Sequence, residues 1–297
     1  MRCLVTGGAG FIGSNLVDRL IAKNVEVIVI DDESATENSK FYWNKNAKNY
    51  KDDICNYNNI EHLFKNVDYV FHLAAQSRIQ PSIVDPTKTL KVNCEGTLNV
   101  LNASKKHNVS RFIYSSTSSY YGLNNKVPFT ENLNRDCLNP YSYTKIFGED
   151  LCKMYHELYD MQIVILRYFN VYGQRQPTKG QYAPVVGIFQ KQFKENKRLT
   201  IVGDGMQRRD YTHVDDVVSA NILAAKNKLS SGFEVFNVGT GINYSVLDIA
   251  KMIGGKYKFI SERKGEAKET LADISKIRKH LNWAPSIKIE KWLKEKK

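Results

Sequence analysis

Membrane-spanning segments, cysteine pairs and histidine pairs at metal-binding spacings are all missing from this sequence of 297 residues. No stretch approaches the roughly 18 consecutive apolar residues that a membrane-spanning helix requires. The first residues, MRCLVTGGAG, lack the charged leader and cleavage site of a signal peptide and lead directly into a strand and a turn. We therefore expect a cytoplasmic protein that does not associate with a membrane.

The cysteines and histidines give no sign of a disulfide framework or a metal site. The five cysteines are odd in number and form no CxxC motif, which is typical of reduced thiols in the cytosol. The six histidines never occur as HxH or HxxxH, the spacings that commonly hold zinc. No metal is expected.

Acidic residues are in the minority, and the formal net charge is +12. Such a balance is found in nucleic-acid-binding proteins, but also in proteins with a lysine-rich, solvated surface. The lysines are spread along the whole chain, and the densest run, the terminal KWLKEKK, contains glutamate. The pattern favours a solvated surface, so no nucleic-acid partner is expected.

Apolar runs rich in valine and isoleucine alternate with helix-like segments through the first half of the chain. This alternation predicts an α/β fold with a doubly wound parallel Rossmann sheet. The expected strands cover residues 2–6, 25–30, 68–73, 111–115 and 162–167. The expected helices cover residues 11–23, 87–107 and 142–159.

The second half is less regular and predicts a smaller, discontinuous C-terminal lobe that binds substrate. Residues 171–210 are rich in Gly, Gln, Arg and Lys and contain turn signals, and residues 241–297 carry short helical patterns near 245–253 and 273–281. The intervening residues 211–240 end in the strand-like FEVFNVG. We expect 1–170 and 211–240 to form the dinucleotide-binding domain, with 171–210 and 241–297 forming the lobe.

A glycine motif follows the first strand and opens the first helix. The run Gly8-x-Gly10-x-x-Gly13 allows a tight turn that brings the backbone close to a pyrophosphate at the helix N-terminus. The second strand ends at Asp31, the position from which a carboxylate accepts the ribose hydroxyls and repels a 2′-phosphate. Asp32 follows and no arginine adjoins, so the motif predicts NAD rather than NADP.

A tyrosine and a lysine in NPYSYTK have a spacing suited to acid–base catalysis. Tyr141 and Lys145 lie at i and i+4, on one face of the expected helix. The ammonium and the helix N-terminus should lower the pKa of the tyrosine, which then acts as a general base towards a sugar hydroxyl. The alternatives are two exposed helix residues, or a role for the neighbouring Tyr143 instead. The hydroxyl-rich run 115–119 follows a strand and is expected to face the same ligand.

These motifs occur in an order that resembles the extended short-chain dehydrogenase/reductases. The carriers of the resemblance are TGGAGFIG, HLAAQ (72–76), NCEGT (93–97), SSTSSYYG (115–122), PYSYTK (140–145), RYFNVYG (167–173), YAPVV, VGDGMQRRDYTHVDDVV, NVGTG and RKGEAKETLADISK…LNW. They cover nearly the whole chain, and the later ones resemble the UDP-sugar 4-epimerase branch. The resemblance implies interconversion of UDP-glucose and UDP-galactose through a transient 4-keto sugar, with NAD regenerated.

The resemblance also implies the site residues. For catalysis it implies Tyr141 as general base, Lys145 as its electrostatic partner and Thr117 as the bridge to the sugar 4-hydroxyl. The residues implied to contact NAD are Gly7, Gly10, Phe11, Ile12, Gly13, Asp31, Asp32, Asp53, Ile54, Leu73, Ala74, Ala75, Asn93, Tyr141, Lys145, Tyr168 and Phe169. Those implied to contact the UDP-sugar are Thr117, Ser118, Ser119, Asn170, Val185, Thr200, Val202, Arg209, Arg263 and Thr270.

Two departures bear on the reaction and the sugar. The related 4,6-dehydratases have Thr-Asp-Glu where this chain has Thr117-Ser118-Ser119, so no carboxylic acid is there to protonate a leaving hydroxyl. Epimerases restricted to glucose and galactose have a tyrosine at the position of Thr270, so the smaller residue predicts that UDP-GlcNAc is accepted too. Alternatives are another NAD-dependent nucleotide-sugar enzyme (a reductase, a decarboxylase or an epimerase at another carbon) and a non-catalytic RNA-binding or scaffold protein. The resemblance also implies a homodimer formed by helices 87–107 and 142–159.

Overall fold

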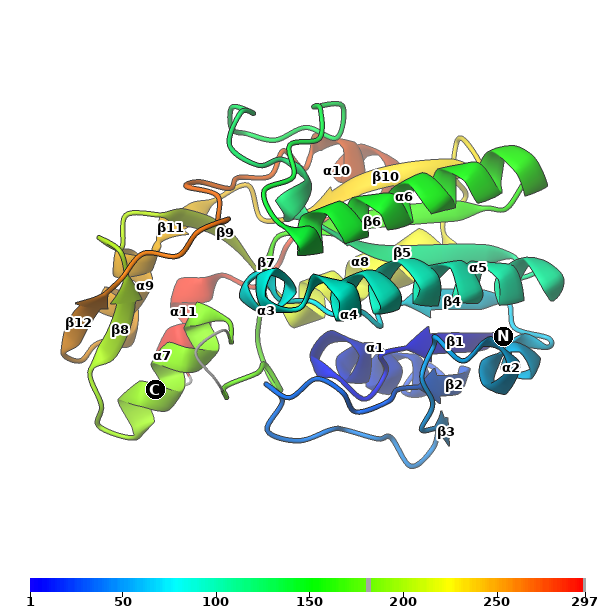
Figure 1. Ribbon diagram of the computed structural model, residues 1–297, viewed down its shortest axis with the longest axis horizontal. Coiled ribbons are helices and arrows are strands. Elements are labelled where there is room, and N and C mark those ends of the chain that lie inside the picture. Colours follow the sequence, from blue (N-terminus) through cyan, green and yellow to red (C-terminus); the bar gives the residue numbers. More distant parts are fainter. Residues whose placement is uncertain (180–182, 296–297) are drawn as a thin grey trace.

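A seven-stranded sheet forms the centre of the computed structural model, which describes residues 1–179 and 183–295. Every neighbouring pair of strands is parallel, in the order β10-β6-β5-β4-β1-β2-β3 (Figure 1). The strands are β1 (Arg2–Thr6), β2 (Glu26–Ile30), β3 (Lys48–Tyr50), β4 (Tyr69–His72), β5 (Arg111–Thr117), β6 (Ile163–Tyr168) and β10 (Phe233–Val238). The predicted fold class, a doubly wound parallel α/β sheet, is confirmed.

Helices cover both faces of this sheet, which explains why its strands are almost continuously apolar. The front layer in Figure 1 contains α3 (Ile79–Val84), α4 (Pro86–Leu90), α5 (Thr97–Lys106) and α6 (Pro140–Tyr159). The layer behind contains α1 (Phe11–Ile21), α8 (Val214–Lys226) and α10 (Ser275–Leu281). Next to α5 lie α2 (Tyr57–Ile60) and the 3-10 turn η1 (Glu61–Phe64). In the inner strands, alternate residues join the two apolar cores, as Leu4 and Val5 do in β1.

The expectation of a single long helix over 87–107 is wrong in one respect. A π-helical turn, η2 (Lys91–Gly96), separates α4 from α5. The turn directs the Asn93 amide inward, where it donates to the Gln76 carbonyl (3.0 Å) and the Thr144 hydroxyl (2.9 Å). Gly96 lies so close to Ile54 that an added Cβ would be 2.5 Å from its Cδ1 atom. Such π-helical turns are common near functional sites.

The smaller elements gather at one end of the main sheet, on the left in Figure 1. They form a three-stranded sheet β11-β9-β7 and a two-stranded sheet β12-β8. Their bounds are β7 (Asn170–Tyr172), α7 (Val185–Lys194), β8 (Leu199–Val202), β9 (Arg208–His213), β11 (Asn243–Ser245), α9 (Val246–Ile253), β12 (Tyr257–Ile260) and α11 (Ile289–Glu295). A separate apolar core holds these elements together, and β10 returns to the main sheet.

The division into two lobes with boundaries near residues 170, 210 and 240 stays a prediction. Strand β9 pairs with β7 and β11, whereas α8 and β10, which follow it, pack on or in the main sheet. Of the motif YAPVV, Tyr182 lies outside the described residues, as do the last two residues of the KWLKEKK tail. Within the described part, no helix is long and apolar enough to cross a membrane.

Candidate active site

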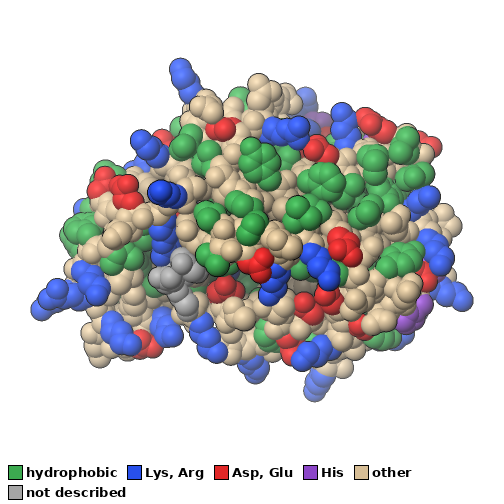
Figure 2. All heavy atoms as spheres, viewed as in Figure 1, with side chains coloured by type: hydrophobic (Ala, Val, Ile, Leu, Met, Phe, Trp, Pro, Cys, Tyr) green, Lys and Arg blue, Asp and Glu red, His purple; other side chains and the backbone are tan. Residues whose placement is uncertain are grey.

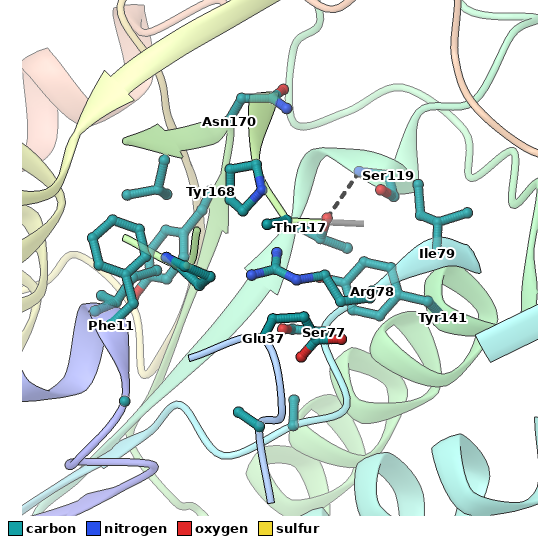
Figure 3. A pocket seen from close by; sticks show the side chains of 18 of the residues that line it. Phe11, Glu37, Ser77, Arg78, Ile79, Thr117, Ser119, Tyr141, Tyr168 and Asn170 are labelled. Carbon is teal, nitrogen blue, oxygen red and sulfur yellow. Dashed lines mark hydrogen bonds between the residues drawn. The ribbon is translucent and has the colours of Figure 1, made fainter. Parts of the chain in front are cut away.

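A cavity of about 490 Å³ opens where the carboxyl ends of the main-sheet strands face the smaller elements. Its walls include residues that follow or end five of the strands: Gly7, Asp31, Leu73, Thr117 and Tyr168. The carboxyl end of an open parallel sheet is where ligands bind in this class of fold. Figure 3 shows side chains from several elements converging on this space.

The glycine turn at the start of α1 leaves no room for side chains. Gly7 has φ +69°, and an added Cβ would lie 2.8 Å from the backbone nitrogen of Ala74. At Gly13 the added Cβ would lie 2.1 Å from the carbonyl oxygen of Gly7. Gly10 caps α1 without a side chain, so the first N–H groups of the helix remain available to an anion. The turn therefore fits the pyrophosphate of a dinucleotide.

Asp31 is fixed beside this turn at the end of β2. Its carboxylate accepts hydrogen bonds from the backbone nitrogens of Ala9 (3.0 Å) and Glu33 (2.9 Å). Burial raises the pKa of Asp31, and the two backbone N–H groups oppose that shift. Each carboxylate oxygen accepts one of these bonds and keeps a lone pair that can accept from a ribose hydroxyl.

Helix α6 delivers the tyrosine and the lysine through a well-defined start. The Asn139 side chain accepts from the backbone nitrogen of Ser142 (2.9 Å), the Ser142 hydroxyl lies 3.3 Å from the Asn139 nitrogen, and Pro140 occupies the first turn. Tyr141 and Lys145 both line the cavity. They are not the exposed pair of the alternative interpretation. Tyr143 is 65% exposed and points away from the site.

The expected fall in the pKa of Tyr141 is wrong for the protein as the structure shows it. Burial is the largest effect and raises the pKa of Tyr141, while a hydrogen bond with Thr117 and the charge of Arg78 lower it. No hydrogen bond joins Lys145 to Tyr141 in the part of the chain that the structure describes. Lys145 is itself buried, its Nζ atom lies 4.2 Å from the centre of the Tyr114 ring, and burial lowers its pKa to about 8.

The hydroxyl side chains at the end of β5 have different partners. Ser115 shares a hydrogen bond with the Tyr168 hydroxyl (2.9 Å), and Ser116 donates to the carboxylate of Glu149. Thr117 is the member that lowers the pKa of Tyr141, and its oxygen accepts from the backbone nitrogen of Ser119 (3.1 Å). Two serines therefore anchor the strand while Thr117 is left beside the tyrosine (Figure 3).

The far end of the cavity carries cationic side chains. Arg209 is held by the carbonyl oxygens of Arg208 (2.9 Å) and Lys268 (3.3 Å), and burial lowers its pKa. Arg263 lines the same cavity, as does the buried Thr270. Guanidinium groups in such a wall suit a diphosphate.

The cavity brings together nearly all the residues singled out from the sequence. Those that line it are Gly7, Gly10, Phe11, Ile12, Gly13, Asp31, Asp32, Asp53, Ile54, Leu73, Ala74, Ala75, Thr117, Ser118, Ser119, Tyr141, Lys145, Tyr168, Phe169, Asn170, Val185, Thr200, Val202, Arg209, Arg263 and Thr270. Asn93 does not line it and instead supports the wall, where its side-chain oxygen accepts from the Gln76 nitrogen (2.8 Å). The individual roles of these residues stay predictions.

Four charged residues of the cavity were missed at the sequence level: Arg78, Glu37, Asp52 and Glu266. Arg78 and Glu37 both line it, and both side chains are drawn near Tyr141 and Ser77 in Figure 3. Arg78 stands two residues after HLAAQ, which is the one local signal that could have drawn attention to it. Glu37 lies in an irregular loop and carries no signal at all.

That loop, residues 32–43, closes the dinucleotide end of the cavity against residues 174–179. The Lys179 nitrogen donates to the Glu37 carbonyl (3.3 Å), and the Arg175 guanidinium lies 4.7 Å from the centre of the Tyr42 ring. Arg175 also pairs with Asp18 of α1 (2.6 Å). Tyr42 of the loop therefore packs against the neighbouring segment. We call these contacts the loop clasp.

Comparison with known proteins places this geometry in a family. The family described as NAD dependent epimerase/dehydratase matches residues 3–239. The chain is similar to the UDP-glucose 4-epimerase of Thermotoga maritima, solved with UDP-glucose, at 38% identity and a TM-score of 0.93. That alignment covers 99% of this chain and 96% of the other.

Two further solved structures are similar over almost the whole chain. The UDP-N-acetylglucosamine 4-epimerase of Methanobrevibacter ruminantium, in complex with UDP-N-acetylmuramic acid, is 34% identical, with a TM-score of 0.92 and coverage of 99% and 96%. The UDP-glucuronic acid 4-epimerase of Bacillus cereus, in complex with UDP-glucuronic acid and NAD, is 35% identical, with a TM-score of 0.89 and coverage of 99% and 97%. The three proteins therefore share one fold and differ in the sugar they are named for.

Proposed function

The chain belongs to the NAD-dependent epimerase/dehydratase family, and from that premise we propose that it inverts the C4 centre of a UDP-linked sugar. The observation that carries the proposal is the presence of Thr117, Tyr141 and Lys145 in the same cavity as the glycine turn. Arg209 and Arg263 at the far end supply the charge that a UDP diphosphate needs. One cavity thus has features for a dinucleotide, a nucleotide-sugar and a proton acceptor.

The reaction assigns a separate task to each side chain. When bound, NAD supplies reversible oxidation at C4, which is chemistry that no side chain of the protein provides. Tyr141 takes the proton from the sugar 4-hydroxyl and later returns it. Thr117 holds that hydroxyl next to the tyrosine, and Lys145 adds positive charge that favours the tyrosinate.

Dehydration is disfavoured by the same wall of the cavity. The two residues after Thr117 are Ser118 and Ser119, and both line the cavity. A serine hydroxyl is a poor acid and does not readily protonate a leaving hydroxyl group. The oxidised sugar is therefore expected to be reduced again at C4 and not to eliminate water.

For the sugar, we propose UDP-glucose and UDP-galactose together with their N-acetylated counterparts. The small Thr270 supports the N-acetylated pair, because its side chain is 5% exposed and forms part of the cavity wall. Its hydroxyl accepts weakly from the Asp210 nitrogen (3.4 Å), which turns the hydroxyl towards the protein. The similarity to a UDP-N-acetylglucosamine 4-epimerase supports the same proposal.

The experiment that tests the proposal follows the anomeric proton by NMR. The purified protein, without added cofactor, is incubated with UDP-glucose and separately with UDP-GlcNAc. A new galacto signal is expected, and Tyr141→Phe should slow its appearance by about 10²- to 10⁴-fold. Tyr143→Phe, an exposed tyrosine two residues away, is the matched control and should be unaffected. Absence of a new signal for both sugars, even with NAD supplied, would overturn the proposal.

We also propose that the chain forms a homodimer through the outer face of α4, α5 and α6. Figure 2, viewed as in Figure 1, shows hydrophobic side chains gathered over these helices. The exposed members are Leu90 (59%), Tyr143 (65%), Phe147 (48%), Met154 (38%) and Leu158 (64%). Four of them recur on one face of α6, and a contiguous exposed apolar patch commonly marks a protein interface. Sedimentation of the protein and of Phe147→Glu is the test, and a monomeric wild type at micromolar concentration would contradict it.

A further inference from the structure

Arg78 is a charged side chain in the middle of the cavity; its charge lowers the pKa of Tyr141, but the proposed reaction gives its N–H donors no partner. It is the residue before α3, and its side chain does not cap that helix. Figure 3 shows the guanidinium extended into the cavity, with Tyr141 and Thr117 beside it and Glu37 nearby. The residue lines the cavity.

The guanidinium of Arg78 has no partner in the part of the protein that the structure describes. Its Nε atom is buried without a hydrogen bond, and no ion pair joins it to Glu37. Burial lowers the pKa of Arg78, while the charges of Glu37 and Tyr141 oppose that shift. A guanidinium remains charged in proteins and has five N–H donors, so leaving the buried Nε atom without an acceptor is unfavourable.

A structural arginine in the same protein shows the contrast. Arg167 is 4% exposed and more deeply buried than Arg78, and it bonds Glu149 through two nitrogens and Tyr121 through the third (2.7, 3.0 and 3.0 Å). Every nitrogen of Arg167 therefore has a partner within the fold. Arg78 has none, so its partner is to be sought in the ligand.

We propose that Arg78 binds a carboxylate carried by the sugar, and that the enzyme therefore prefers UDP-hexuronic acids to the matched neutral UDP-sugars. This inference rests on the proposed C4 epimerisation. Tyr141 and Thr117 mark the position of the 4-hydroxyl, and C6 is attached to C5, the carbon next to C4. A carboxylate at C6 thus lies close to the hydroxyl that these residues hold. The planar fork of a guanidinium matches the two oxygens of a carboxylate.

The phosphates of the ligands have other partners. The glycine turn and the N-terminus of α1 face the dinucleotide, and Arg209 and Arg263 lie at the UDP end. Arg78 lies between these ends, beside the reacting hydroxyl. The second charge near it is Glu37, which attracts Arg78 and repels a sugar carboxylate. Removing Glu37 should therefore strengthen the binding of an acidic sugar.

The test uses two ligand pairs that differ only at C6: UDP-glucose with UDP-glucuronate, and UDP-GlcNAc with UDP-N-acetylglucosaminuronate. Their dissociation constants are measured by calorimetry on the NAD-loaded protein. The acidic member of each pair should bind at least about tenfold more tightly. Arg78→Gln should raise the dissociation constant of the acidic ligand by about 10- to 100-fold and change that of the neutral ligand by less than about twofold. Arg78→Lys should restore part of the loss, and Glu37→Gln should tighten the acidic ligand only.

Three results would overturn the inference. An equal loss for neutral and acidic ligands would assign Arg78 to the shared UDP diphosphate. Loss of bound NAD from Arg78→Gln, measured by its absorbance after denaturation, would assign it to the cofactor. Tighter binding of the neutral sugars by the wild type would exclude a carboxylate site. Measurements of binding and of turnover distinguish the two proposals. If the protein prefers acidic ligands in an Arg78-dependent way but does not epimerise them, only the proposed reaction is contradicted.

Discussion

Replacing Glu149 by alanine should unfold the protein several degrees earlier, because it isolates a buried charge. Glu149 of α6 and Arg167 of β6 form a two-point ion pair, with distances of 2.7 and 3.0 Å and side chains 8% and 4% exposed. The same carboxylate accepts from Ser116, the residue before Thr117. The pair therefore joins a helix and two strands directly beneath the site.

The size of the effect follows from burial. Removing one partner of a buried ion pair costs about 3–5 kcal/mol, because the remaining charge is neither solvated nor paired. For 297 residues, an unfolding entropy of about 2.1 cal/mol/K per residue amounts to about 0.6 kcal/mol/K. The melting temperature of Glu149→Ala should therefore fall by about 5–8 °C.

Two variants make the measurement decisive. Asp150→Ala is the matched control, since the neighbouring Asp150 pairs with Arg135 at the surface with side chains 57% and 61% exposed, and its loss should cost less than about 1 kcal/mol. The double variant Glu149→Leu/Arg167→Met removes both charges and should regain most of the lost stability. Calorimetric melting of the four proteins is the assay. The reasoning fails if Glu149→Ala melts no earlier than Asp150→Ala, or if the double variant melts below the single one.

Three further predictions concern the site. Gly13→Ala should abolish retention of NAD, because its Cβ would clash with the Gly7 carbonyl; an NAD content equal to wild type would contradict the crowded turn. Asp31→Ala should weaken the binding of NAD at least about tenfold and reduce the preference of the protein for NAD over NADP, as fluorescence titration with both cofactors would show. Burial lowers the pKa of Lys145 from 10.5 to about 8. Between these two pH values the unfolded chain binds more protons than the folded protein, so the free energy of unfolding increases as the pH rises. Lys145→Met should remove this increase in the free energy of unfolding, measured by denaturant titration at pH 7.5 and 10. An unchanged pH dependence would contradict the assignment of the increase to Lys145.

Features set by short stretches of sequence could be predicted, and features set by what lies opposite in space could not. The glycine turn needs only Gly8, Gly10 and Gly13 between a strand and a helix, and the helix expected over 142–159 is α6, which begins two residues earlier at Pro140. By contrast, the π-helical turn at 91–96 depends on Gln76 and Thr144 reaching Asn93 across the fold. No periodicity in 87–107 carries that information.

The pKa of Tyr141 illustrates the same limit for electrostatics. The i, i+4 spacing correctly placed Tyr141 and Lys145 on one wall of the cavity. It gave no measure of burial, which is the largest effect on both groups and acts against charge on each. Arg78 was overlooked for a related reason: its importance comes from having no partner, which only the folded structure shows.

The loop clasp has a consequence for how long a cofactor stays in place. Because Glu37 and Tyr42 contact residues 174–179, we expect a dinucleotide lying under residues 32–43 to leave after these contacts have separated. We expect its residence time to span many turnovers, since epimerisation returns NAD to its starting oxidation state. Once loaded, the enzyme is then independent of the concentration of free NAD in its surroundings. The supply of NAD would then limit activity when the cofactor first binds and not during later turnovers.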